Sequence, residues 1–345
     1  MKGRKMKAIP VEEAVGTVLC HDITRIVPGE SKGPAFRRGH VVTDHDISTL
    51  LDIGKANLYV YDPRDGYVHE DTAALRLAAA AAGANITLNG PTEGKVTLSA
   101  ACDGLLEIDT AALMALNSLE DVTFATVHSH QFVQKGRALA GTRVIPLAVP
   151  EELLSQAEAI CSRNDPLIQV KPLKAARVGV VTTGSEIYSG RIKDGFGPVL
   201  RSKFQTLGST VTEQILVSDQ VEMTVQAIRS LLADGADLIA VTGGMSVDPD
   251  DQTPLAIRQT GAEIVSYGAP TYPGAMFMLA YLEGVPLVGL PGCVMYHKAS
   301  IFDLVIPRIL AGERLARKEI VALGHGGFCE GCPSCRYPAC GFGKI

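Results

Sequence analysis

The chain has 345 residues, 46% of them hydrophobic and 20% charged, so it can bury sizeable cores and is too long for one ordinary domain. Its formal net charge is −5, and its basic residues are too dispersed to predict nucleic-acid binding. No apolar run approaches the ~18–20 residues of a membrane span, and the basic start lacks the apolar stretch of a signal peptide. We therefore expect a cytoplasmic protein.

Two small modules are expected in the first half of the chain. Residues 1–62 predict a mixed, β-rich module with one helix that begins near Thr43, where Asp46 completes an acceptable cap pattern three residues later. Residues 63–172 predict an α+β module, in which an alanine-rich helix ends at Gly83 and strand-like segments with turn residues follow.

The region 173–322 has a different pattern, in which short apolar runs alternate with helical segments. Strands that are buried on both faces and separated by helices are typical of an α/β domain with a doubly wound, mostly parallel sheet. The remaining residues, 323–345, form a cysteine-rich tail. Within the α/β region we expect strands in 176–184, 210–219, 237–244 and 285–292, and helices in 197–208, 221–235, 253–261 and 294–310.

Three of the expected strands end in small residues. These ends are Thr183-Gly184-Ser185, Gly243-Gly244 and Pro291-Gly292. In open parallel sheets, ligands bind beyond the carboxyl ends of the strands, and glycine lets backbone N–H groups approach an anion. One such end alone is more simply a tight turn, where glycine is the default residue. Because three such ends occur in one sheet, a ligand-binding edge becomes about as good an interpretation as three tight turns.

Carboxylates gather next to these loops. Glu186 follows the first loop, Asp219 ends the second strand, and Asp248, Asp250 and Asp251 follow the third. Bare carboxylates repel phosphate and raise one another's pKa. The arrangement becomes favourable if Mg²⁺ lies between protein and ligand, because this ion commonly joins one or two carboxylates to substrate phosphates. Each acid could instead be a solvated loop residue or a helix cap.

The loop sequences resemble the motifs of a known family. "TTGSEI" is similar to TGDEL, and "DLIAVTGGMSVDPDDQT" to D-[LIV]3-[ST]-GG-x-S-x(4)-D. "YPGAMF" and "VGLPG" resemble the PGKP and GLPGN motifs. All four belong to the molybdopterin-binding domain shared by molybdopterin molybdotransferases, the gephyrin E domain and molybdopterin adenylyltransferases. Their order and spacing also agree, which is far more specific than any single motif.

The resemblance implies a ligand and a reaction. The ligand is molybdopterin or its adenylylated form, and the reaction is the Mg²⁺-dependent insertion of molybdate with release of AMP. Dimers are common in this fold, so a homodimer is expected by analogy. The implied catalytic residues are Glu186, Asp219 and Asp251, with Asp251 and Asp248 expected to hold Mg²⁺. The implied cofactor-binding residues are Thr183, Gly184, Ser185, Gly243, Gly244, Ser246, Pro273, Gly274, Pro291, Gly292 and Cys293.

Three positions depart from the family motifs. Ser185 stands where TGDEL has aspartate, Ala275 where PGKP has lysine, and Cys293 where GLPGN has asparagine. We expect these three substitutions to impair catalysis more than ligand binding. Two hypotheses therefore stay open: a molybdotransferase, and a non-catalytic carrier that delivers molybdopterin to a molybdoenzyme. A nucleotide-processing relative with the same fold is a third.

Cysteine is concentrated at the C-terminus in the spacing C-x2-C-x2-C-x4-C. Four thiolates this close suit one tetrahedral zinc ion or an iron–sulfur cluster, and a disordered tail with free thiols is the simpler alternative. Cys293 lies before an expected helix, whose N-terminus would lower the pKa of its thiol, but a small buried residue that fills a turn is the favoured interpretation. The candidate metal ligands of the tail are Cys329, Cys332, Cys335 and Cys340.

Overall fold

The structure is a computed structural model that describes residues 8–27, 31–59, 66–162 and 165–344, and it divides into two compact units. Among the described helices, none has the length and hydropathy needed to cross a membrane. The division into four domains expected from the sequence stays a prediction. The first unit comprises Met1–Ser99, Asp109–Val127 and Ala138–Ile168, and the second comprises Ala100–Ile108, His128–Arg137 and Gln169–Ile345.

The first unit is built from small sheets and short helices. Its elements are β1 (Ala8–Pro10), η1 (Val11–Glu13), β2 (Ile23–Val27), β3 (Ser31–Phe36), α1 (Asp46–Asp52), β4 (Asn57–Tyr59), β5 (Tyr67–His69), α2 (Glu70–Ala81), β6 (Ile86–Thr92), β7 (Lys95–Ala100), α3 (Thr110–Asn117), β9 (Val122–Thr126), β11 (Ala138–Val144), β12 (Ala148–Pro150) and α4 (Glu151–Cys161). The pairs β1–β4, β2–β3 and β5–β12 are antiparallel, and a four-stranded sheet has the order β6-β7-β11-β9.

Two expected helices are present in this unit. The helix expected near Thr43 begins three residues later, at Asp46. The predicted interaction forms nevertheless, because the Asp46 carboxylate accepts hydrogen bonds from the backbone N–H and the hydroxyl of Thr43, each at 2.8 Å. The alanine-rich helix is α2, and its Ala78 and Ala81 are fully buried.

The second unit contains a six-stranded sheet flanked by helices. Its elements are β8 (Gly104–Ile108), β10 (Phe132–Val133), β13 (Ile168–Lys171), β14 (Arg177–Thr183), α5 (Ser185–Tyr188), α6 (Phe196–Thr206), β15 (Thr210–Val217), α7 (Val221–Ala233), β16 (Leu238–Thr242), α8 (Thr253–Gln259), β17 (Glu263–Tyr267), β18 (Met278–Leu282), β19 (Val285–Leu290), α9 (Cys293–Tyr296), α10 (Ile301–Leu310) and α11 (Arg317–Ala322). The sheet order is β15-β14-β16-β19-β18-β17. The first four strands are parallel, β18 pairs antiparallel with β19, and β17 pairs antiparallel with β18. The predicted doubly wound, mostly parallel sheet is confirmed.

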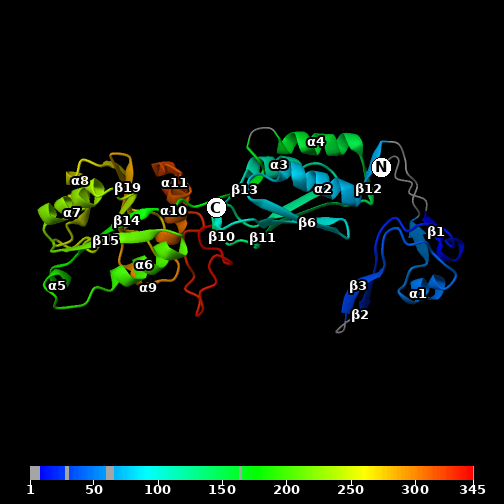
Figure 1. The fold of residues 1–345 in the computed structure, drawn as a ribbon, viewed down its shortest axis with the longest axis horizontal. Helices are drawn as coiled ribbons and strands as arrows, with labels where there is room; N and C mark the ends of the chain where they lie inside the picture. The colour runs from blue at the N-terminus through cyan, green and yellow to red at the C-terminus, as the bar shows by residue number, and fades with distance from the viewer. Residues whose placement is uncertain (1–7, 28–30, 60–65, 163–164, 345) are drawn as a thin grey trace. The chain divides into compact units, whose positions relative to one another are not determined.

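Both faces of this sheet are covered. Val180 belongs to the hydrophobic cluster that includes α6 and α10, while its neighbour Val181 packs with residues of α7 and α8. Figure 1 shows α7 and α8 on one side of the sheet and α6 on the other. Because successive side chains point to opposite faces and both faces are buried, the strands appear in the sequence as continuous apolar runs.

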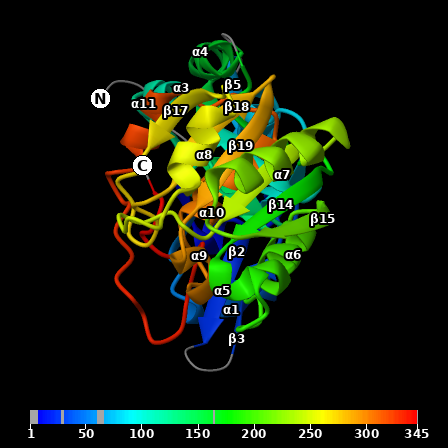
Figure 2. The same cartoon turned by 90° about the vertical axis from the view of Figure 1, so that its left-hand side faces the viewer.

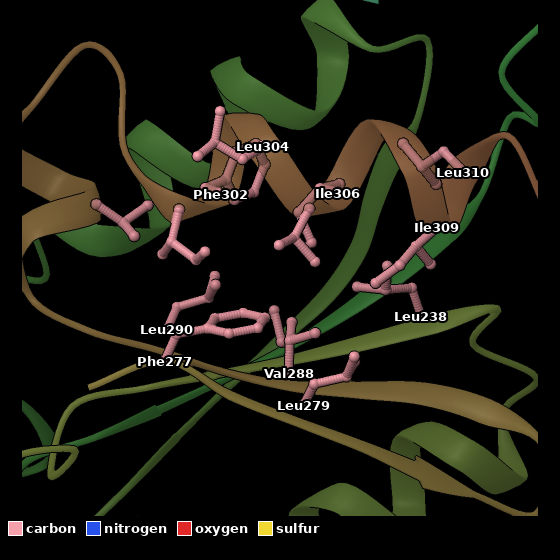
Figure 3. Packing of buried hydrophobic residues seen from close by; sticks show 14 of the residues in the cluster. Leu238, Phe277, Leu279, Val288, Leu290, Phe302, Leu304, Ile306, Ile309 and Leu310 are labelled. Atoms are coloured by element: carbon pink, nitrogen blue, oxygen red, sulfur yellow. The ribbon is translucent and has the colours of Figure 1, made fainter. Parts of the chain in front are cut away.

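Helix α10 fills the centre of the larger cluster. Nine of its ten residues are buried. Figure 3 shows side chains of α10, such as Phe302 and Ile306, facing Val288 and Leu279 of the sheet. Each fully buried side chain of this size contributes ~1.5–3 kcal/mol, so this interface stabilises the packing of the helix on that face of the sheet.

The single helix expected over 294–310 is wrong, because the structure has two helices, α9 and α10, separated by residues 297–300. The cause is a capping box at Ser300. Its hydroxyl accepts the N–H of Phe302, and the Asp303 carboxylate accepts the N–H of Ser300 at 2.8 Å. These bonds favour a new helix start at this position.

The C-terminal tail packs against the same unit. Phe342 is only 3% exposed and belongs to the cluster around α10. Figure 2 shows the segment before it, in red, as a wide arc without a helix. The tail is therefore anchored at its far end rather than detached.

Candidate functional site

The carboxyl ends of the four parallel strands lie side by side. Thr183 of β14 pairs with Val217 of β15, Thr182 with Thr242 of β16, and Thr242 in turn with Leu290 of β19. The loops that follow these strands therefore leave the sheet at one edge, called the strand-end rim below. Ligands bind at this edge in open parallel sheets.

Gly243 and Thr183 touch across the rim. Gly243 has a φ of +84°, and a Cβ there would collide with the carbonyl oxygen of Thr183 and lie 2.7 Å from its hydroxyl. Thr253 holds the same loop, because its hydroxyl donates to the carbonyl of Gly243 at 2.8 Å and its N–H to that of Gly244 at 3.1 Å. Glycine is thus required here for close packing of two strand-end loops.

The loops after β14 and β15 are joined by a carboxylate. The N–H of Ser185, which follows Gly184, donates to Asp219 at 2.8 Å. Glu186 is the next residue and is exposed, whereas Asp219 is half-buried. The structure thus brings Ser185, Glu186 and Asp219 to one part of the rim.

The loop after β16 folds back on itself through Asp251. The Asp251 carboxylate accepts the N–H of Ser246 at 2.9 Å, and its own N–H donates to the carbonyl of Asp248 at 2.9 Å. Asp248 is exposed and Asp251 half-buried. The pKa of Tyr267, whose hydroxyl bonds to this loop's backbone, is raised by burial and by the negative charge of Asp251. Asp251 is therefore the acid with the firmest position in this loop.

The loop before β18 also reaches the rim. Met278, the first residue of β18, pairs with Gly289 near the end of the antiparallel β19. The carbonyl of Pro273 accepts the N–H of Ile301 at 3.2 Å. Gly274, at φ +140°, packs so closely on Ile301 that a Cβ would lie 2.5 Å from it. This loop is consequently fixed to the start of α10.

Pro291 and Gly292 open the short helix α9. Their carbonyls accept the N–H groups of Val294 and Met295, each at 3.0 Å. Cys293 is half-buried, and burial raises the pKa of its thiol although hydrogen bonds from its own N–H and that of Val294 oppose this. The expectation of a lowered pKa is wrong, because a four-residue helix has too weak a dipole to outweigh burial.

The rim acids do not form a preassembled metal cluster. Within the described ranges, no three histidine, cysteine, aspartate or glutamate side chains lie close enough to hold one metal ion. Asp219 and Asp251 stand on the two sides of β14, and each uses one carboxylate oxygen to hold a loop N–H. This donor set does not fit a cage of three carboxylates. It does fit Mg²⁺, which takes one or two carboxylates and completes its ligands with phosphate and water.

A further polar chain at the rim was missed from the sequence. Asp194 accepts the N–H groups of Phe196 and Gly197 at the start of α6, at 2.8 and 3.0 Å. It also accepts a hydrogen bond at 2.7 Å from Gln214, whose amide donates to the Thr182 hydroxyl at 3.0 Å. An aspartate two residues before a helical pattern is a cap signal that would have located Asp194.

The tail cysteines adjoin one rim loop, because the N–H of Cys329 donates to the carbonyl of Tyr272, the neighbour of Pro273, at 2.8 Å. Cys332 and Cys335 are exposed, and Cys329 and Cys340 are half-buried against the cluster around α10. All four line one hollow of about 300 Å³ together with residues 296–299, between α9 and α10. No three of these cysteines, all of which belong to the described residues, lie close enough together to hold one metal ion.

A doubly wound α/β unit with glycine loops and acids at its strand ends belongs to the class of open α/β sheets, which bind ligands beyond the carboxyl ends of their strands. Residues 179–311 match the family model described as "Probable molybdopterin binding domain". Residues 179–311 are therefore similar to this family, in agreement with the motifs in the sequence. Residues 8–62 match a second family model, described as "Domain of unknown function (DUF8806)".

Curated relatives agree with the first match. A molybdopterin molybdenumtransferase of Staphylococcus aureus (strain COL) is 28% identical over 131 residues, which cover 36% of this chain and 31% of that protein. A molybdopterin molybdenumtransferase of Staphylococcus epidermidis is 27% identical over the same length. The chain thus spans about a third of the length of the curated relatives it matches.

Solved structures of the same group align with the chain at low scores. The tungsten cofactor synthesizing protein MoaB from Pyrococcus furiosus aligns with 22% identity and a TM-score of 0.35, covering 42% of this chain and 98% of that one. The molybdopterin biosynthesis moea protein from Pyrococcus horikosii aligns with 14% identity and a TM-score of 0.33, covering 89% of this chain and 74% of that one.

Proposed function

We propose that the α/β unit binds molybdopterin, or its adenylylated form, at the strand-end rim, and that the chain acts as a Mg²⁺-dependent molybdotransferase that releases AMP. The observation that carries the proposal is the common register of the ends of β14, β16 and β19, with Gly243 packed on Thr183. The relatives named molybdopterin molybdenumtransferase support the same reading.

The chain's own groups have separate parts in this proposal. Backbone N–H groups of Gly243 and Gly244 and the hydroxyl of Ser246 would face the phosphate, and Asp251 with Asp248 would hold Mg²⁺. Glu186 and Asp219, which lie across β14 from Asp251, would contact the rest of a diphosphate ligand through a bound cation or water. When bound, Mg²⁺ would neutralise charge that develops on the leaving phosphate.

Position 275 favours a second candidate function. Alanine there removes the lysine of the family motif, and with it one contact to phosphate or molybdate. A carrier that binds molybdopterin and delivers it to a molybdoenzyme would tolerate this loss. The proposal includes a cytoplasmic homodimer for either function.

An AMP-release assay tests the enzyme proposal. The full chain is incubated with adenylylated molybdopterin, molybdate and Mg²⁺, and AMP is measured. We expect Asp251→Asn to reduce AMP release roughly 100-fold or more, because the amide keeps the bond to Ser246 N–H but loses the charge that holds Mg²⁺. Asp250→Asn is the matched control, since Asp250 is exposed in the same loop and is expected to leave the rate unchanged.

The two functions give different results in this assay. Tight binding of the pterin without AMP release by the unmodified chain would reject the enzyme and retain the carrier. Failure to bind either form of molybdopterin would reject both.

A further inference from the structure

The cysteine-bearing segment of the tail is closed at both ends. At its start, the N–H of Cys329 donates to the carbonyl of Tyr272 at 2.8 Å, and the N–H of Tyr272 donates to Gly327 at 2.7 Å. At its end, the N–H of Gly343 donates to Gly326 at 2.9 Å, and Phe342 is buried in the core. Residues 329–342 thus form a loop whose two ends are fixed next to each other.

The interior of this loop has little regular structure to hold its shape. It has turns and bends but no helix or strand, as the red arc in Figure 2 shows. Its contacts with the rest of the unit include a hydrogen bond from the Tyr337 hydroxyl to the carbonyl of Asp303 at 3.1 Å. Short segments that cannot bury a core of their own are commonly stabilised by a metal centre.

The loop and residues 296–299 together line an open hollow of about 300 Å³, and all four cysteines border it. At ~30 Å³ per molecule, this space would hold roughly ten waters, far more than a single ion replaces. A zinc ion at about 2.3 Å from each sulfur would require the four sulfurs to lie within about 4 Å of one another. In the described part of the chain, no three such ligands are that close to a common point. The geometry therefore does not fit one zinc ion.

The charges around the hollow suit an anionic group. Lys298 and Arg336 line it, and the residues of its described lining include no aspartate or glutamate. Four thiolates that ligate a metal centre carry more negative charge than an iron–sulfur core neutralises. Nearby cations stabilise such a group in a partly buried place.

We propose that Cys329, Cys332, Cys335 and Cys340 bind a [4Fe–4S] cluster in this hollow. The three cysteines in C-x2-C-x2-C spacing bind one side of the cluster, and Cys340 binds it from the segment that returns to the core. The iron–sulfur cluster occupies the hollow that the four cysteines line, and it stabilises the position of the loop beside α9 and α10. This site adjoins the rim loop at Tyr272 but does not include the proposed ligand-binding residues, so it does not depend on the proposed function.

Metal analysis of the full chain tests the proposal. The protein is purified anaerobically, reconstituted with iron and sulfide, and assayed for iron, acid-labile sulfide and zinc. We expect about four iron and four sulfide per chain with a broad visible absorption band. Cys332→Ser and Cys335→Ser should each lose most of the iron, and both side chains are exposed, so neither change should disturb folding.

Cys102→Ser is the matched control, because Cys102 is a half-exposed cysteine elsewhere in the same unit. It should keep the full iron content. One zinc per chain without iron, no metal after reconstitution, or iron that persists in both tail variants would each overturn the proposal.

Discussion

Replacing Gly243 with alanine should destabilise the α/β unit by about 2–5 kcal/mol. The first part of this cost is conformational, because alanine at a φ of +84° costs ~1–2 kcal/mol relative to glycine. The second part is steric, since the new Cβ would collide with the backbone carbonyl of Thr183. That carbonyl belongs to the last residue of β14 and cannot move without disturbing the ladder with β15, so a further ~1–3 kcal/mol is expected.

Gly208→Ala separates the two contributions. Gly208 has a φ of +75° in the turn after α6, and nothing lies within 4 Å of a Cβ placed there. This variant should therefore show only the conformational cost of ~1–2 kcal/mol. Urea unfolding followed by far-ultraviolet circular dichroism measures both variants in the same unit. Equal losses for the two, within about 0.5 kcal/mol, would refute the idea that the two strand-end loops are packed against each other at Gly243.

Two further predictions concern buried groups. Arg308→Met should cost about 3 kcal/mol or more, because the half-buried Glu313 loses the buried cation that contacts it at 2.7 Å. The double variant with Glu313→Gln should recover most of the loss in the same urea titration, and a single-variant loss below about 1 kcal/mol would contradict this. In metal-free protein at pH 8, iodoacetamide should modify the exposed Cys332 well before Cys20 and Cys161, since burial raises the pKa of each of these two thiols to about 11. Mass-spectrometric mapping decides this, and equal modification rates would show that the two buried thiols are accessible.

The strands of the α/β unit were predictable because both of their faces are buried, which makes nearly every position compact or apolar. Val180 and Val181 face opposite cores, so every position of β14 from 178 to 183 had to be compact and mostly apolar. Glycine at the strand ends then located the rim, since parallel strands in register end at one edge. The pairing of Thr182 with Thr242 shows that register directly.

Other features depend on contacts between residues distant in sequence. The apolar pattern of residues 294–310 concealed the capping box at Ser300, which interrupts the helix although its signal was present. Asp194 became recognisable as a rim residue only through Gln214 and Thr182, which come from two other segments. Cysteine spacing indicated a metal site, but the burial of Phe342 that closes the tail loop is a tertiary contact that spacing does not encode.

Equilibrium binding of molybdopterin to the full chain, with and without Mg²⁺, tests the central claim most directly. If the rim acids and the ligand's phosphate share a cation, Mg²⁺ should tighten binding at least roughly tenfold, about 1.4 kcal/mol, and Asp251→Asn should remove that gain while Asp250→Asn keeps it. Binding that is equally tight without Mg²⁺, or a Mg²⁺ effect that survives in Asp251→Asn, would contradict the account.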